Sequence, residues 1–297
     1  MLNKELVLIN FKITQVRSIS ALIIVLTHVL QVNDNKWAFF LNSAVGTFMV
    51  ISGYLHSKKH INNPVSWVKK KLMRVLTPYY IFIIFAIPAS YFIFKNFNFK
   101  DVLIYVLGLQ GFFSFEPNGI GNLWFITAIL IAYMITPIFI NNNFFIKLFI
   151  YIIIFTLFYM GLVPFGIANS LYCYLIGLTF PSLLTKKSNF LIFTSIIFLI
   201  FFLLEFEFIS NDLISLVRTP VLGIILFYLL YHIDLNYFKK TLNIISNYSY
   251  ELYLTHGIIT FALVPFGTTI FRTSLWMCLV VLLPIILKKL PIWVSLK

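Results

Sequence analysis

Apolar stretches of about twenty residues recur along the whole chain, and they constrain its fold more than any other feature. A helix of about 20 apolar residues is long enough to cross the hydrocarbon core of a bilayer. Inside the bilayer every backbone N–H and C=O must be bonded within the protein, so repeated spans of this kind have to be helices. Of the 297 residues, 61% are hydrophobic and 10% are charged. We therefore expect one integral-membrane domain over 1–297, with no appended soluble domain.

Hydropathy predicts an all-α fold, a polytopic transmembrane helical bundle of about ten spans. The stretch 102–115 is too short for a comfortable crossing, and we expect it to be re-entrant or interfacial. The predicted spans are 15–32, 37–56, 75–94, 122–140, 146–163, 170–185, 189–209, 213–231, 245–265 and 274–287.

The basic residues are clustered between the predicted spans, and their distribution predicts the orientation. Cytoplasmic loops of membrane proteins are enriched in Lys and Arg. If 102–115 does not cross and both termini are cytoplasmic, most basic residues lie inside. If it did cross, every later loop would invert and place Lys186, Lys187, Lys239 and Lys240 outside, against this bias. Topology thus explains the net charge of +13, and no nucleic-acid partner is expected.

Several kinds of chemistry have no signature in the sequence. Cys173 and Cys278 lie in apolar segments without metal-type or redox-type spacing, which favours small buried side chains. Zinc-ligand spacing, a Gly-x-Ser-x-Gly elbow and a Walker-type glycine loop are also lacking. The N-terminal residues lack the small-residue cleavage pattern of a signal peptide. We expect no metal ion, no permanently bound cofactor and no removable leader.

The first predicted span carries two ionisable residues, Arg17 and His28, eleven positions apart. Eleven helical residues rise about 16 Å and make roughly three turns, so both side chains lie on one face. Arg17 is then at the inner boundary and His28 lies toward the outer side. A membrane-anchoring arginine and a structural histidine would fit the same pattern. Ionisable groups at membrane depth nevertheless favour a functional interpretation.

The predicted inner loop around 57–74 is the most basic segment of the chain. It contains six Lys or Arg residues and no acid, among them Lys70, Lys71 and Arg74. Orientation and anionic lipid account for part of this charge, but the density also suits a polyphosphate ligand. The sequence leaves both interpretations open.

A further set of residues combines small or polar side chains with predicted spans, so each is a candidate for lining a cavity or binding a substrate. Helix packing and interfacial anchoring are the structural alternatives. The set comprises Ser52, Gly53, Trp124, Ser249, Tyr253 and His256. The last three of these residues share one helix face in the stretch 249–256.

These segments, in this order, resemble the membrane acyltransferase 3 family, whose bacterial members commonly O-acylate cell-surface sugars. The sequence departs from the family pattern at two places. Thr14 occupies a position where the family often has aspartate. In the basic Arg-x-x-Arg motif, Lys71 replaces the first arginine and Arg74 keeps the second. Lysine keeps the charge but loses the bidentate fork of arginine. The segments that carry the resemblance are "RSISALIIVLTH", "FMVISGYL", "KKKLMRVLTPYY", "LWFITAILIAYMITP" and "SYELYLTH".

The resemblance implies a multi-pass enzyme of the bacterial plasma or inner membrane that moves an acyl group, most simply acetyl, from cytoplasmic acyl-CoA to a carbohydrate hydroxyl. It implies His28 as the catalytic base, and Arg17, Lys70, Lys71 and Arg74 as acyl-CoA-binding residues. Membrane lipid and the carbohydrate acceptor are the other expected partners. A transporter or flippase of lipid-linked sugars is the alternative, although no internal repeat supports it.

Overall fold

The structure is a computed structural model, and it is entirely helical over the residues that it describes. No strand occurs among these residues, which are 2–57, 60–95, 98–113, 119–189, 191–193, 195–197, 212–263 and 270–295. The all-α prediction is therefore confirmed for this part of the chain.

The helices follow one another with short connections, as is typical of a membrane bundle. In chain order they are α1 (Leu2–Val32), α2 (Trp37–Leu41), α3 (Ser43–Tyr54), α4 (Pro64–Phe94), α5 (Phe99–Val106), η1 (Gln110–Phe112), η2 (Gly121–Leu123), α6 (Trp124–Asn141), α7 (Phe144–Tyr159), α8 (Phe165–Thr179), α9 (Pro181–Thr185), α11 (Asp212–His232), η3 (Asn236–Phe238), α12 (Lys239–Ala262) and α13 (Ile270–Ser295).

Local sequence signals account for several helix starts. The Asn63 side chain caps α4 by accepting a hydrogen bond from the Ser66 backbone N–H, and a proline occupies the first turn. Asn98 and Asp101 form a reciprocal capping box at α5. These caps satisfy N–H groups that the helices themselves leave unpaired.

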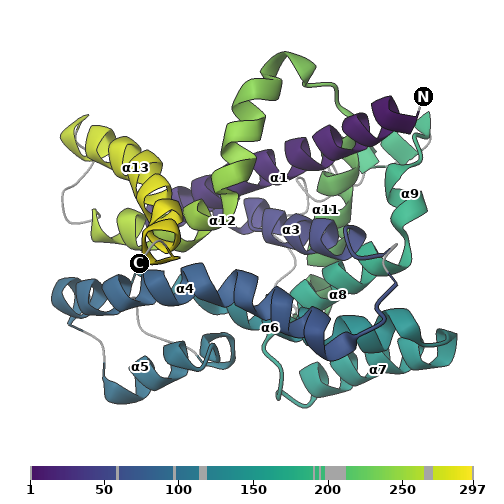
Figure 1. Ribbon diagram of the computed structural model, residues 1–297, viewed down its shortest axis with the longest axis horizontal. Helices are drawn as coiled ribbons and strands as arrows, with labels where there is room; N and C mark the ends of the chain where they lie inside the picture. The colour runs from purple at the N-terminus through teal and green to yellow at the C-terminus, as the bar shows by residue number, and fades with distance from the viewer. Residues whose placement is uncertain are drawn as a thin grey trace.

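Helix α1 runs through the middle of the bundle beside α12, α3 and α11 (Figure 1). Its buried polar side chains bind backbone carbonyls of its neighbours. The Gln15 amide donates to the carbonyls of Leu230 (2.5 Å) and Ile233 (2.9 Å). The Ser18 hydroxyl donates to the carbonyl of Leu242 (2.6 Å). These bonds set the rotation of α1, because turning it would leave polar atoms unpaired in an apolar interior.

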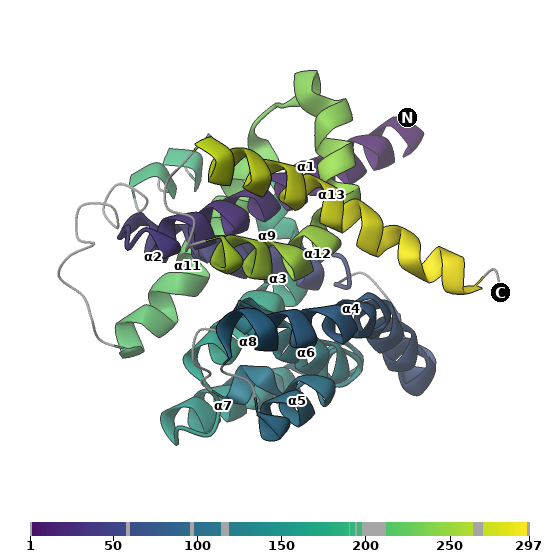
Figure 2. The ribbon, with the colours of Figure 1, turned by 90° about the vertical axis from the view of Figure 1, so that its left-hand side faces the viewer.

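The remaining helices surround this centre. In Figure 2, α1 and α13 lie toward one side of the molecule and α5 and α7 toward the opposite side. The same view shows that α1 begins and α13 ends at the same side. The cytoplasmic placement of both termini stays a prediction.

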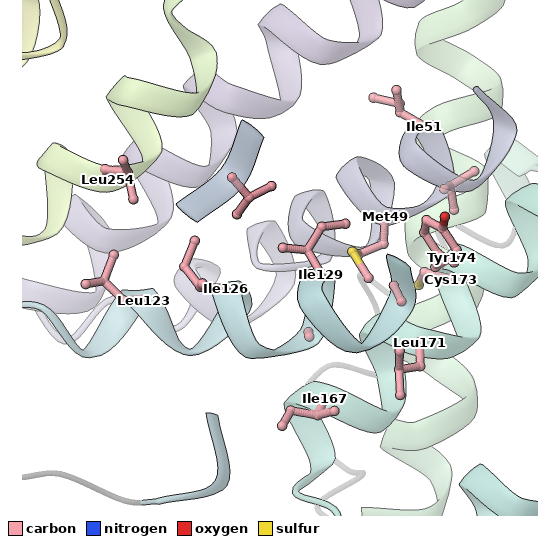
Figure 3. Close-up of a cluster of buried hydrophobic side chains, with 14 of the residues drawn as sticks. Met49, Ile51, Leu123, Ile126, Ile129, Ile167, Leu171, Cys173, Tyr174 and Leu254 are labelled. Atoms are coloured by element: carbon pink, nitrogen blue, oxygen red, sulfur yellow. The ribbon is translucent and has the colours of Figure 1, made fainter. Parts of the chain in front are cut away.

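The main core lies between α3, α6 and α8. Figure 3 shows Met49, Ile129 and Leu171, one from each of these helices, within this cluster of buried apolar side chains. The backbones of α3 and α8 approach closely through glycines. A Cβ atom on Gly53 would lie 2.0 Å from the Tyr174 carbonyl oxygen. Gly53 is therefore a packing residue, the structural alternative considered for it above.

Three helical segments are long and apolar enough to cross a membrane by themselves, and they match the predicted spans 15–32, 75–94 and 122–140. Helices α11 and α12 pass the same test only together, and they are bent by 86° at their junction. That makes three clear candidate spans, or four with the bent pair, among the described residues. The total of ten stays a prediction.

The other predicted spans correspond to shorter or interrupted helices. The span 37–56 is divided between α2 and α3, and α7 and α8 have 16 and 15 residues. Helices of that length rise about 22–24 Å, less than the about 30 Å hydrocarbon core. The span 274–287 lies within α13, and most of 189–209 lies outside the described residues.

The segment 102–115 contains no spanning helix in its described part. It consists of the end of α5, which has 8 residues, and the short turn η1. A helix of 8 residues rises about 12 Å, so it does not cross a bilayer by itself. This agrees with the predicted re-entrant or interfacial segment.

The close contact of α3 with α8 gives a first prediction. Replacing Gly53 by alanine forces the two backbones apart, because the new methyl group meets a main-chain oxygen that has little room to move. Overpacking of this kind costs about 1–3 kcal/mol. We expect the detergent-solubilised G53A variant to unfold several degrees below the wild type in a thermal-shift measurement. An I84A variant, changed on the exposed face of α4, serves as control, and equal unfolding temperatures for G53A and wild type would contradict the prediction.

Candidate functional site

Three of the predicted acyl-CoA-binding residues lie together at one end of the bundle. Arg17 of α1 is within electrostatic range of Arg74 of α4 and of the Tyr133 side chain of α6. The Lys71 ammonium lies 5.8 Å from the centre of the Tyr133 ring and 5.4 Å from that of Trp67. We call Arg17, Lys71 and Arg74 the basic cluster. Three cations held close together on two helices suit a ligand with several negative charges.

Lys70, the fourth predicted residue, is placed differently. Its side chain is exposed on α4, and no hydrogen bond or ring contact among the described residues joins it to the basic cluster. Successive helical residues are turned by about 100°, so the face of α4 that presents Lys71 and Arg74 to α6 directs Lys70 further toward the surface.

Aromatic side chains and a histidine surround the basic cluster, and the sequence analysis did not single them out. The ring of His56 lies 5.2 Å from the centre of Trp67 and 5.5 Å from that of Tyr133. His56 Nδ1 lies 3.2 Å from the hydroxyl of Tyr174, which is also 2.6 Å from the hydroxyl of Thr136. A histidine beside the basic loop and tyrosines along two predicted spans were the available signals, but only the fold shows that they meet.

The two candidate histidines, 228 residues apart in the sequence, form a pair at the other end of α1. The ring centres of His28 and His256 are 4.9 Å apart. His256 is completely buried in α12, and His28 is partly buried. The His28 ring therefore faces the interior of the bundle, not the lipid. We call these two residues the histidine pair.

Hydrogen bonds orient both rings of the histidine pair in the same way. His28 Nδ1 lies 3.0 Å from the amide oxygen of Gln31, and His256 Nδ1 lies 3.0 Å from the carbonyl oxygen of Leu252. A backbone carbonyl only accepts hydrogen bonds, so His256 Nδ1 donates to Leu252, and in the neutral ring its Nε2 then keeps a lone pair. The same holds for His28 when its Nδ1 donates to the Gln31 amide oxygen. The His256 Nε2 is buried without a hydrogen-bond partner among the described residues. Neutral imidazoles in this tautomer can accept a proton at Nε2.

Tyr253 and Ser249 follow His256 down the same face of α12. The Tyr253 hydroxyl donates to the backbone carbonyl of Asn122 (2.5 Å), and the Asn122 amide donates back to the Tyr253 carbonyl (3.0 Å). The Ser249 hydroxyl donates to the Ser246 carbonyl within the helix (2.9 Å). The tyrosine thus ties α12 to the start of α6.

An apolar cavity of about 60 Å³ lies between the basic cluster and the histidine pair. Along α1, Arg17 is one turn before Ala21 and His28 is one turn after Ile24, and both Ala21 and Ile24 line this cavity. We call it the apolar cavity. Its lining residues are Ala21, Ile24, Val25, Val45, Phe48, Phe125, Ser249, Tyr250 and Tyr253.

The other predicted lining residues lie outside the apolar cavity. Gly53 is held in the contact between α3 and α8, and Ser52 is a partly buried neighbour that does not line it. Trp124 lines a separate, polar cavity on the far side of α3 from α1, together with Arg218 and Asn169. The sequence analysis passed over Arg218 and Asn169 as candidates.

The described residues contain no group of three or more His, Cys, Asp or Glu side chains that could hold a metal ion. The groups that the described residues of the site offer are imidazole, hydroxyl, guanidinium and ammonium groups. A base at one end, a cation cluster at the other and an apolar cavity between them suit transfer of a group from an anionic carrier to a nucleophile.

Comparison with known families places the chain in one of them. The family model of the acyltransferase 3 type, described as an acyltransferase domain, matches residues 10–289. No curated protein and no solved structure matches the chain. The matched region contains the basic cluster, the apolar cavity and the histidine pair. The chain is an acyltransferase and belongs to the acyltransferase 3 family.

Proposed function

We propose that this acyltransferase moves an acyl group, most simply acetyl, from cytoplasmic acyl-CoA to a hydroxyl of a cell-surface or secreted carbohydrate. The observation that carries the proposal is the order of features along α1: basic cluster, apolar cavity, histidine pair. The donor is a thioester on a polyanionic carrier, and the acceptor is a neutral alcohol. The surroundings of Arg17, in the middle of α1, and of His28, near its C-terminal end, suit these two substrates.

The basic cluster would bind the phosphates of acyl-CoA at the cytoplasmic end. Arg17 and Arg74 contribute guanidinium groups, and Lys71 contributes an ammonium group between two aromatic rings. Phosphates bound there stay near water, so their charges do not have to be desolvated. The acyl group at the tip of the uncharged thioester arm then reaches the apolar cavity, which has room for a few small groups.

His28 would act as the general base. Its Nε2 takes the proton of the acceptor hydroxyl while the hydroxyl oxygen attacks the thioester carbonyl. When the tetrahedral intermediate collapses, the C–S bond breaks, and the imidazolium returns the proton to the departing thiolate. The products are the acyl ester and free CoA thiol, and His28 is neutral again. No permanently bound cofactor takes part.

His256 would orient the acceptor. In the tautomer set by the Leu252 carbonyl its Nε2 accepts hydrogen bonds. It can therefore bind a hydroxyl beside His28, but it has no proton at Nε2 to donate to an oxyanion.

The proposed reaction can be tested on the product. Mass spectrometry of surface carbohydrates from cells with and without the gene should show material heavier by one acyl unit when the gene is present. The mass of that unit distinguishes acetyl from a longer group. Identical carbohydrate masses, with the protein present in the membrane, would exclude a surface carbohydrate as the acceptor.

Removing the imidazole of His28 tests the catalytic base. We expect H28A to lower the rate of carbohydrate acylation about 100- to 10,000-fold, the usual contribution of general-base catalysis, with unchanged protein in the membrane. The matched control is H60A, which removes an exposed histidine outside the histidine pair and should leave the rate unchanged. Wild-type acylation by H28A would remove His28 from the mechanism.

Removing two cations from the basic cluster tests the donor site. We expect the K71A/R74A double variant to bind acyl-CoA at least about tenfold more weakly, because each charged hydrogen bond is worth about 1.5–3 kcal/mol. Its affinity should also depend less on salt concentration than that of the wild type, since fewer charges are screened.

The control for this variant is K186A/K187A, which removes two exposed cations elsewhere. Binding is measured by titration of the purified protein at several salt concentrations. If both double variants bind acyl-CoA equally weakly, the affinity depends on the overall charge of the protein and the basic cluster is not the donor site.

A further inference from the structure

A second cavity, separate from the apolar cavity, lies where α3, α6, α8 and α11 meet. It measures about 70 Å³, and its lining includes Arg218, Asn169, Ser170, Ser43 and Trp124. We call it the polar cavity. Unlike the apolar cavity, it is lined by a cation, an amide and hydroxyl groups. Polar groups of this kind are rare inside a membrane bundle, and they favour a functional interpretation.

The Asn169 side chain shows most directly that the polar cavity is built for a ligand. Asn169 is only 4% exposed, and both its amide nitrogen and its amide oxygen are buried without hydrogen-bond partners among the described residues. Buried amides are nearly always hydrogen-bonded, and an unpaired one is costly. An amide that lines a cavity in this state is ready to bind a polar group placed there.

The electrostatics of the polar cavity favour a negative charge. Arg218 is 6% exposed and lines the cavity from α11. The first residues of three helices also border it: Ser43 of α3, Trp124 of α6 and Phe165 of α8. Helix N-termini carry a partial positive charge and free N–H groups, and they bind anions well. A guanidinium group binds a carboxylate or phosphate through two parallel hydrogen bonds.

The polar cavity adjoins the apolar cavity at the end of α1 that carries the histidine pair. Val45 lines both cavities, and the neighbours Phe125 and Trp124 line one each. The residue after α2, Asn42, is exposed at the rim, so the polar cavity is reached from the surface. With a volume of about 70 Å³ it has room for a few water-sized groups, which suits one acidic substituent and not a whole sugar ring.

From these observations we infer that the polar cavity binds the acidic group, carboxylate or phosphate, of an acidic saccharide acceptor, with Arg218 and Asn169 as its ligands. This inference rests on the proposed function and specifies its acceptor. Anchoring the acidic group there leaves the rest of the sugar beside Val45, with its hydroxyls toward the histidine pair.

Binding to the purified full-length protein tests the inference without relying on catalysis. The probes are methyl glucuronide, glucose 1-phosphate, neutral methyl glucoside and inorganic phosphate. In neutral detergent we expect the two acidic sugars, but not methyl glucoside, to raise the unfolding temperature of the wild type. Equal stabilisation by methyl glucoside would overturn the inference, and so would inorganic phosphate alone acting as strongly as the acidic sugars, since that indicates a simple anion or lipid-phosphate site.

Variants assign the effect to the polar cavity. R218Q should lose the stabilisation by both acidic sugars, and R218K should keep part of it, because lysine keeps the charge without the fork. N169L removes an unpaired buried amide in favour of an apolar group of similar size. It should therefore weaken acidic-sugar binding about tenfold while the unfolding temperature without ligand stays the same or rises. Undiminished binding by folded N169L and R218K would overturn the assignment.

Acyl transfer to the same probes separates this inference from the proposed function. In wild-type protein, methyl glucuronide should have a KM at least about tenfold below that of methyl glucoside, and R218Q should abolish this difference without changing the KM for acetyl-CoA. Transfer to both sugars with equal KM values would overturn the inference and leave the proposed function standing. Tight binding of acidic sugars without any transfer would instead overturn the proposed function.

Discussion

The arrangement of this protein depends on the cost of leaving a polar group unpaired in an apolar interior. Helix α1 carries Gln15 and Ser18, and both are bonded to backbone carbonyls of α11 and α12. These bonds fix one rotation of α1 about its axis. The same rotation also fixes where Arg17 and His28 point, although these two residues lie on a different face of α1 from Gln15 and Ser18. The rest of the proposed site is assembled around the face that this constraint selects.

The cations of the site and its two histidines lie apart along α1, and the apolar cavity lies between them. Gln31 orients His28 without adding a charge, whereas a carboxylate in that place would have to be desolvated as well.

Family membership favours the enzyme over the transporter that the sequence also allowed, and the structure suggests how two very different substrates meet. An anionic thioester and a sugar hydroxyl need opposite surroundings. The apolar cavity suits the uncharged arm of the donor, and the polar cavity, which shares Val45 with it, offers a cation and an amide. Two cavities of opposite polarity thus adjoin at Val45.

The sequence by itself determined the helical class, the family, the shared face of Arg17 and His28 and the basic segment, because these follow from hydropathy and from the period of a helix. Only the tertiary structure decided which candidates meet. Lys71 and Lys70 point in different directions from α4, and only Lys71 lies over the ring of Trp67 among the described contacts. Gly53 is a packing residue because it lies against the backbone of α8. The pairing of His28 with His256, and the unpaired amide of Asn169 near Arg218, join helices that are far apart in the chain. Such contacts depend on how several helices pack at once, which no local pattern of residues encodes.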